Sequence, residues 1–215
     1  MIFSRGRRFI FIHIPKTGGT SLALAYEARA MKDDILVGDT PKAARRRKRQ
    51  KGVFPQGALR KHMTLADLCG LLGPEDLSGV MVCTLVRNPW ARCLSYYRWL
   101  RLQSFDHPAV ATAKRESFDG FLNDPEIAAS LRHGTAESYV TAAGAPAPHF
   151  IRLEHPDADL PAVEAYLGFP LRPLPHVNAS AREGLAAAYT PALAARVADL
   201  CAADIARFGY RFPDP

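Results

Sequence analysis

A lysine, two glycines and three hydroxyl residues follow one another near the start of the chain, in the segment from Pro15 to Ser21 (PKTGGTS). Gly18 and Gly19 allow backbone N–H groups to approach a ligand closely, and Lys16 adds a positive charge at the same place. An anion bound there would meet N–H groups, hydroxyl groups and an ammonium group. The segment therefore predicts a turn that binds an anionic group such as a phosphate.

Two elements must hold this turn in place. Phe9–Ile14 is aromatic or β-branched apart from His13, which predicts a strand buried on both faces. From Thr20 onward, strong helix formers and a hydroxyl N-cap predict a helix, whose first N–H groups and dipole favour an anion. The lysine precedes the glycines, so the segment is not a Walker A loop. An ordinary strand–turn–helix connection with an exposed lysine stays open.

A second strand–turn–helix pattern lies further along the chain. Val80–Val86 predicts another buried strand, and Pro89 fits the first turn of the helix that follows. Arg87 would lie at the carboxyl end of this strand, and Ser95 about two turns into the helix. Ligands of open α/β sheets bind at the carboxyl ends of strands. Arg87 and Ser95 are therefore expected to bind one phosphate, with Arg87 as a bidentate donor.

The two motifs together resemble those of a known enzyme family. Ile14–Ser21 (IPKTGGTS) resembles the 5′-phosphosulfate loop of sulfotransferases that use 3′-phosphoadenosine 5′-phosphosulfate (PAPS). Arg87–Tyr97 (RNPWARCLSYY) resembles their 3′-phosphate motif, and the motifs occur in the family's order. The likeness is to the carbohydrate-type branch, which includes the uronyl 2-O-sulfotransferases and small bacterial members.

The resemblance implies a fold, a co-substrate and a set of binding residues. The expected fold is α/β, a single domain over residues 1–215 with three layers, a central parallel sheet flanked by helices and a P-loop-NTPase-like turn. PAPS would be the co-substrate, with Lys16 also acting catalytically on the leaving oxygen. The residues expected to bind it are Lys16, Thr17, Gly18, Gly19, Thr20, Ser21, Arg87, Ser95, Asn178 and Ser180.

Weaker likenesses extend the comparison along the chain. Phe150–Glu154, followed by Asp159 and Leu160, resembles the family's later strand and the helix after it. Asn178 and Ser180 fall in an Asn-x-Ser segment that in the family closes over the nucleotide. Tyr189–Phe212 resembles the terminal helix.

The acceptor hydroxyl must lose a proton, so a general base is expected. His62 is the candidate, because an imidazole with an ordinary pKa of about 6.5 suits this role near neutral pH. It precedes Thr64, a predicted helix N-cap, and resembles the family's Gly/Lys-His-x-Thr stretch, in which a histidine is the base. Lys61 replaces the commoner glycine. A surface histidine without a catalytic role stays open.

Other candidates have weaker support. His13 is interpreted as a core histidine, and His176 as either a site residue or part of a rigid proline-rich loop. Glu154 lies two residues after Arg152, which favours a structural ion pair or loop anchor and makes Glu154 the reserve base. The aromatic residues after Arg87 are expected mostly in the core, with one available to stack on adenine: Trp90, Tyr96, Tyr97 and Trp99.

Composition limits the class of protein. The 215 residues are 48% hydrophobic, enough for one α/β domain, and no apolar run approaches the roughly 20 residues of a membrane span. We expect a cytoplasmic protein with buried free thiols in place of disulfides. Its cysteines lack metal-ligand spacing, and the expected chemistry requires no metal. These cysteines are Cys69, Cys83, Cys93 and Cys201.

The formal net charge of +7 is local to residues 42–51, which contain seven basic side chains and no acidic one. Without them the chain is formally neutral. Two interpretations stay open, a solvated and partly disordered loop or a basic flap that attracts an anionic acceptor such as an acidic glycan. Nucleic-acid binding is not expected, because no aromatic residues are interleaved with the charges.

The sequence favours sulfuryl transfer from PAPS to an acceptor hydroxyl, with a carbohydrate as the preferred acceptor class. The alternatives are a P-loop kinase for a small molecule, and a non-catalytic protein that binds a nucleotide or a polyanion. Neither the acceptor nor the oligomeric state is encoded in a recognisable motif.

Overall fold

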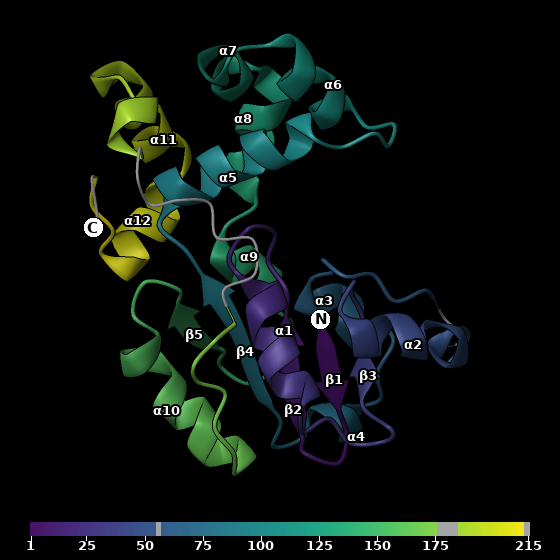
Figure 1. The fold of residues 1–215 in the computed structure, drawn as a ribbon. Helices are drawn as coiled ribbons and strands as arrows, with labels where there is room; N and C mark the ends of the chain where they lie inside the picture. The colour runs from purple at the N-terminus through teal and green to yellow at the C-terminus, as the bar shows by residue number, and fades with distance from the viewer. Residues whose placement is uncertain (55–56, 176–184, 213–215) are drawn as a thin grey trace. The chain divides into compact units, whose positions relative to one another are not determined.

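The computed structural model describes residues 1–54, 57–175 and 185–212 (Figure 1). These residues form two compact units. The first unit contains residues 1–86 and 137–175, and the second contains residues 87–136 and 185–212. Each unit has its own hydrophobic core, and the first also contains the β-sheet.

The sheet of the first unit has five strands in the order β3-β1-β2-β4-β5. Their bounds are Ile2–Ser4 (β1), Phe9–Ile12 (β2), Ile35–Leu36 (β3), Met81–Val86 (β4) and His149–Arg152 (β5). β2, β4 and β5 are parallel, whereas β1 is antiparallel to both β2 and β3. The predicted α/β class is confirmed, but the prediction of a wholly parallel sheet is wrong. A short turn joins β1 to β2, and only antiparallel strands can be joined that way.

Helices pack on both faces of this sheet. Alternate side chains of β2 point to opposite faces, so that Phe9 and Phe11 contribute to one apolar cluster and Ile10 and Ile12 to another. The first cluster includes residues of α1 and α10, and the second includes residues of α3 and α9. The helices of this part of the chain are α1 (Gly19–Glu27), α2 (Pro41–Gln50), α3 (Leu65–Cys69), α4 (Pro74–Leu77), α9 (Ala136–Val140) and α10 (Pro156–Leu167).

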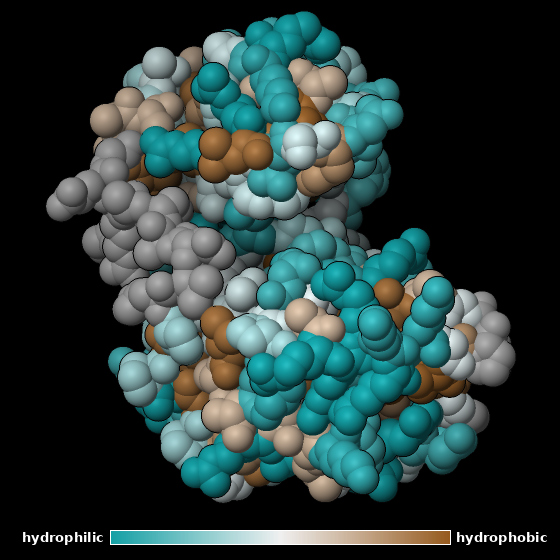
Figure 2. Space-filling view, turned by 45° about the vertical axis from the view of Figure 1, so that its right-hand side comes forward, coloured by the Kyte–Doolittle hydropathy of each residue, from teal (hydrophilic) through white to brown (hydrophobic). Residues whose placement is uncertain are grey.

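The basic segment forms helix α2, so the interpretation as a partly disordered loop is wrong. The buried carboxylate of Glu27 accepts hydrogen bonds from the N–H groups of Lys42 and Ala43 (3.1 and 3.0 Å) in the first turn of the helix. Arg46 donates to two main-chain carbonyl oxygens of the loop before β3, both at 2.7 Å. These contacts offset the repulsion between like charges. Elsewhere on the visible face of the first unit, hydrophobic surface shows between hydrophilic side chains (Figure 2).

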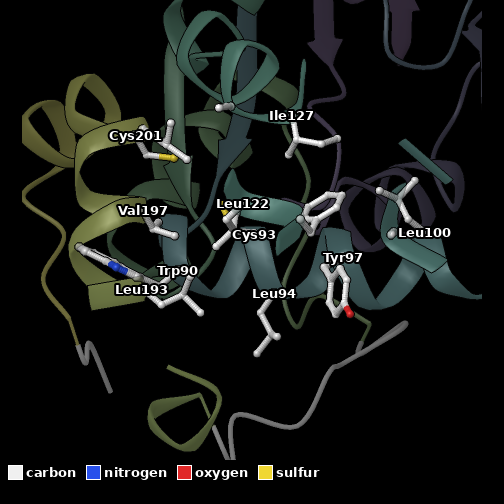
Figure 3. Packing of buried hydrophobic residues seen from close by; sticks show 14 of the residues in the cluster. Trp90, Cys93, Leu94, Tyr97, Leu100, Leu122, Ile127, Leu193, Val197 and Cys201 are labelled. Carbon is white, nitrogen blue, oxygen red and sulfur yellow. The ribbon is translucent and has the colours of Figure 1, made fainter. Parts of the chain in front are cut away.

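The second unit is helical. Its helices are α5 (Pro89–Arg101), α6 (Pro108–Arg115), α7 (Phe118–Asn123), α8 (Pro125–His133), a 3₁₀ turn (Ala186–Ala188), α11 (Pro191–Leu200) and α12 (Ala202–Phe208). Leu193 and Val197 of α11 pack toward Trp90 and Cys93 of α5 (Figure 3). The terminal helix expected over residues 189–212 is divided at Cys201, whose backbone is not helical.

The cysteines and the lengths of the helices bear on two further predictions. All four cysteines have free thiols, and Cys83, Cys93 and Cys201 are buried, as expected. Throughout the described residues, the structure contains no helix with the length and apolar character needed to span a membrane.

Candidate active site

The predicted strand–turn–helix is present at the anion-binding motif, between the end of β2 at Ile12 and the start of α1 at Gly19. Lys16 and Gly18 both have left-handed backbone conformations, with φ of 66° and 87°. A residue with a side chain costs about 1–2 kcal/mol in this conformation. The neighbouring structure must therefore hold Lys16 in a strained position, which is common at binding sites.

The helix start differs from the sequence prediction in one respect. Thr20 was expected to provide a hydroxyl N-cap, but the N-cap is Gly18, two residues earlier, without a side-chain cap. A glycine cap leaves the first N–H groups of the helix without a hydroxyl partner from the cap residue. This arrangement is suited to binding an external anion.

Both glycines of the turn are required by packing. A Cβ atom on Gly19 would lie 2.4 Å from Cδ2 of His13, and one on Gly18 would lie 2.8 Å from Cδ1 of Leu153. Both distances are shorter than any van der Waals contact between carbon atoms. The helix start is thus packed directly against the His13 ring, a contact that the sequence did not suggest.

The hydroxyl residues of the turn have different environments. Thr17 is buried, and its hydroxyl donates to the carbonyl oxygen of Ile14 (2.9 Å), which closes the turn. The N–H of Ser21 donates to the carbonyl oxygen of Gly18 (2.9 Å), so this N–H is used within the first helical turn. Ser21 is also buried, whereas Thr20 is partly exposed. Of the three hydroxyl groups, that of Thr20 has the best access to a ligand.

His62 lies against this turn. Its Nδ1 atom is 2.8 Å from the carbonyl oxygen of His13, and the two imidazole rings meet edge to face with centroids 4.8 Å apart. A carbonyl oxygen can only accept a hydrogen bond, so Nδ1 of His62 must carry the hydrogen. Nε2 then has a lone pair, which is the form of the side chain that can take up a proton. Neutral His62 is therefore the tautomer with hydrogen on Nδ1, and its Nε2 atom is the one able to accept a proton.

Both histidines are neutral near pH 7. The pKa of His62 is lowered to about 4, mainly because the ring is buried. The charge of Lys61 also lowers this pKa, whereas the hydrogen bond to His13 raises it. Burial also lowers the pKa of His13 well below its ordinary value. His13 is 5% exposed, which confirms the prediction of a core histidine.

Neighbouring groups hold His62 in place on both sides. Lys61 donates to Asp39 at 2.9 Å, which joins this segment to the loop before α2. On the other side, Thr64 and Asp67 form a capping box at the start of α3, with reciprocal side-chain to N–H bonds of 3.1 and 3.0 Å. The predicted N-cap at Thr64 is confirmed. The contribution of Asp39, by contrast, had no signal in the sequence.

The second motif begins helix α5, as predicted. Asn88 is the N-cap, and its side-chain oxygen accepts hydrogen bonds from the N–H groups of Trp90 and Ala91 (3.0 and 3.2 Å). Pro89 occupies the first helical turn, which confirms its predicted position. Arg92 forms an ion pair with Asp204 at 3.7 Å. Several side chains of this motif thus stabilise the second unit.

The predicted phosphate ligands of this motif, Arg87 and Ser95, lie before α5 and within it. Arg87 directly follows β4 and is partly exposed, and Ser95 lies on α5 with 9% exposure. Trp90 and Tyr97 are buried in the core, as expected, whereas Trp99 is 37% exposed. Stacking of an aromatic residue on adenine stays a prediction.

Arg152 lies two residues before Glu154, the predicted reserve base. Arg152 binds Asp159 through two hydrogen bonds of 2.8 Å, so the carboxylate that it engages is one turn into the α10 region. This ion pair lowers the pKa of Asp159. The predictions for His176, Asn178 and Ser180 lie outside the described residues.

Comparisons with known proteins leave this site as the main guide to function. Neither a protein-family model nor a curated protein matches the chain. Within residues 1–54, 57–175 and 185–212, no three His, Cys, Asp or Glu side chains are grouped so that they could bind a metal ion. The residues that bear on function are therefore those of the turn, His62 and the motif that begins at Arg87.

Proposed function

We propose that this protein transfers a sulfuryl group from PAPS to an acceptor hydroxyl, with His62 as the general base. The observation that carries the proposal is the hydrogen bond from Nδ1 of His62 to the carbonyl oxygen of His13. His13 is also the residue whose ring packs against Gly19 at the start of α1. A neutral base is therefore held beside a helix start that is suited to an anion.

The family resemblance assigns a different phosphate group of the donor to each motif. N–H groups at the start of α1 and the hydroxyl of Thr20 would bind the 5′-phosphosulfate, in a turn that resembles a P-loop. Lys16 would neutralise the charge that develops on the leaving oxygen, a form of electrostatic catalysis. Arg87 and Ser95 would bind the 3′-phosphate, with the planar guanidinium group well matched to phosphate oxygens.

The reaction itself is a single displacement. The acceptor oxygen forms a bond to sulfur while the bond from sulfur to the 5′-phosphate oxygen breaks, and that oxygen leaves with the electron pair. The proton of the acceptor hydroxyl passes to Nε2 of His62. Adenosine 3′,5′-bisphosphate and the sulfated acceptor are the products. Because the pKa of His62 is lowered to about 4, the side chain is unprotonated at neutral pH. The same shift makes it a weaker base than an ordinary histidine, so proton uptake must be coupled to formation of the bond to sulfur.

The experiment that tests this function is a transfer assay. The purified protein is incubated with PAPS and a set of glycans, phenols and aliphatic alcohols, and sulfated products are detected by mass spectrometry. We expect product with at least one acceptor, and formation of that product at least about 100-fold slower with the His62→Gln variant. His155→Gln, at an exposed histidine of the same unit, is the matched control and should retain activity. Product formation by His62→Gln at the wild-type rate would contradict the proposed mechanism.

A further inference from the structure

A cavity of about 360 Å³ lies beside helix α2, within the first unit. Much of its wall is apolar and comes from the end of β3, the buried side of α2 and residues 52–54 and 57–59. Phe54 and Leu59 are among the apolar side chains of this wall. Leu36, Val37 and Ala43 also contribute to it. We name this space the α2 cavity.

The charged groups of the α2 cavity are all positive. Arg47, Lys48 and Lys51 line it, and no acidic side chain is among its described lining residues. Arg47 is also 3.7 Å from Asp39. In the described parts of the chain, neither Lys48 nor Lys51 forms an ion pair. The cavity therefore combines an apolar wall with ammonium groups that can neutralise an anion.

Uncharged polar side chains are scarce in this cavity. Gln50 is the one carboxamide among its described lining residues. That group is already used when the amide is oriented with its nitrogen toward the main-chain oxygen of Leu36 and its oxygen toward the Leu36 nitrogen, at 2.8 and 3.0 Å. A saccharide bound here would find cationic donors but few side-chain acceptors for its hydroxyl hydrogens, which is unfavourable. An apolar ligand that carries one anionic group fits the lining better.

The wall of the α2 cavity is close to Lys61, the neighbour of the candidate base in the sequence. Gly38 lines the cavity, and a Cβ atom on Gly38 would lie 3.8 Å from Cε of Lys61, the residue before His62. A second, much smaller cavity of about 10 Å³ shares Gly38 with the first and is also lined by His13, Thr20 and Lys61. Residues of the α2 cavity wall and residues at the turn thus line this smaller cavity together.

We propose that the α2 cavity binds the acceptor, and that this acceptor is a small amphiphilic anion, namely an apolar hydroxylated molecule with one carboxylate or similar group. The assignment as acceptor rests on the proposed sulfuryl transfer, whereas binding of such an anion does not. The ammonium groups of Lys48 and Lys51 hold the anionic end, and the wall formed by Phe54 and Leu59 holds the apolar body. This acceptor class differs from the polysaccharides favoured by the sequence resemblance.

The binding test uses 6-hydroxy-2-naphthoate, which has an apolar body, one carboxylate and one hydroxyl group. Titration calorimetry at low ionic strength compares it with 2-naphthol, which lacks the anion, and with glucuronate, which lacks the apolar body. We expect 6-hydroxy-2-naphthoate to bind tightest. Tighter binding of glucuronate would overturn the proposal in favour of a saccharide site.

Variants locate the binding within the cavity. Lys48→Ala combined with Lys51→Ala should weaken binding of 6-hydroxy-2-naphthoate by about tenfold, the size expected for the loss of two partly exposed ion pairs. Lys48→Arg with Lys51→Arg should restore it. Arg45→Ala, at an exposed position of α2 outside the cavity lining, is the matched control and should bind normally. Equal weakening by Arg45→Ala would show only general charge attraction and would overturn the site.

A steric variant and a transfer assay complete the test. Ala58 lines the cavity but is exposed, so that Ala58→Trp should fill the space without unfolding the protein, as checked by circular dichroism. It should abolish binding of 6-hydroxy-2-naphthoate and leave binding of adenosine 3′,5′-bisphosphate unchanged. With PAPS present, the wild type should sulfate 6-hydroxy-2-naphthoate and Ala58→Trp should not. Naphthoate binding without nucleotide binding would reject the proposed function alone, and nucleotide binding without naphthoate binding would reject this inference alone.

Discussion

The two sequence motifs are built in opposite ways. In the turn before α1, the backbone is the main feature, because Lys16 and Gly18 have left-handed conformations and Gly19 has no space for a side chain. At the start of α5, side chains are the main feature, because Asn88 caps the helix and Arg92 pairs with Asp204. The first motif is defined by backbone conformation at a helix start, which is suited to a ligand. Side chains of the second motif mainly stabilise the second unit.

The largest effect is expected at His62, beside the turn. Replacing His62 with Gln keeps a hydrogen-bond donor near the carbonyl oxygen of His13 but removes the base. The turnover number should fall about 10²- to 10⁴-fold, as is typical for loss of a general base, while the affinity for adenosine 3′,5′-bisphosphate stays within twofold. Steady-state kinetics and calorimetry measure the two quantities. A parallel loss of affinity would mean that His62 shapes the turn and is not the base.

The pH dependence gives a second test of His62. The pKa of this residue is lowered in the folded protein to about 4, so the base stays unprotonated until the pH falls toward that value. The acidic limb of kcat/KM should therefore have its midpoint well below the ordinary histidine pKa of about 6.5. The same shift makes the fold less stable as the pH falls through this range, because the unfolded chain takes up the proton more readily. Circular dichroism at each pH separates loss of activity from unfolding, and a midpoint near 6.5 would contradict the account.

Gly19→Ala should have the next largest effect, on stability as well as on binding. The added Cβ atom would lie 2.4 Å from the buried ring of His13, so the turn or the ring must move. Overpacking of this kind costs about 1–3 kcal/mol in the free energy of unfolding, measured by denaturant titration. Gly70→Ala, where the backbone is not left-handed and a Cβ atom would be 3.5 Å or more from its neighbours, is a control for glycine replacement alone. A second change, His13→Ala, should recover part of the loss, and strictly additive effects would show that the two residues do not interact.

The contrast between the motifs is sharpened at the second one. Asn88→Ala removes the cap of α5 and should lower the free energy of unfolding by about 0.5–2 kcal/mol. Arg87→Ala, one residue earlier, should change stability less and should weaken nucleotide binding more. Thermal unfolding and calorimetry on both variants give the comparison. If Arg87→Ala were the more destabilising of the two, the assignment of Arg87 to ligand binding would lose its support.

The smallest expected effect has the opposite sign. Lys16→Gly relieves the left-handed strain at this position, and the folded protein should be equally stable or more stable, by up to about 1 kcal/mol. Lys16→Ala keeps the strain and should not gain stability. Both variants should bind the nucleotide more weakly, because both lack the ammonium group. A stability gain together with lost binding is the signature of a residue that is strained for function.

Local patterns were sufficient to predict much of the fold near the site. The strands at β2 and β4, the helices after them, the N-cap at Thr64 and the burial of His13 all follow from short stretches of sequence. These features depend on residues that are close in the chain, such as Pro89 in the first turn of α5. Local propensity therefore identified these strands, helices and the cap correctly.

Features that depend on distant residues were missed. The like charges of residues 42–51 favoured a partly disordered loop or a basic flap. The helix forms because Glu27 of α1 accepts hydrogen bonds from the first turn of α2. The antiparallel β1 was too short to give a clear pattern. The contact between Gly19 and His13 and the ion pair between Lys61 and Asp39 depend on the folded chain and have no local signal.

One set of titrations tests the central claim most directly. Adenosine 3′,5′-bisphosphate and adenosine 5′-monophosphate are titrated by calorimetry into the wild type, Lys16→Ala and Arg87→Ala. We expect the bisphosphate to bind the wild type with micromolar affinity or better and the monophosphate to bind at least about tenfold more weakly. Lys16→Ala should weaken binding of both nucleotides, whereas Arg87→Ala should weaken only that of the bisphosphate. Equal affinity for the two nucleotides, or no binding of the bisphosphate at micromolar concentration, would contradict the account.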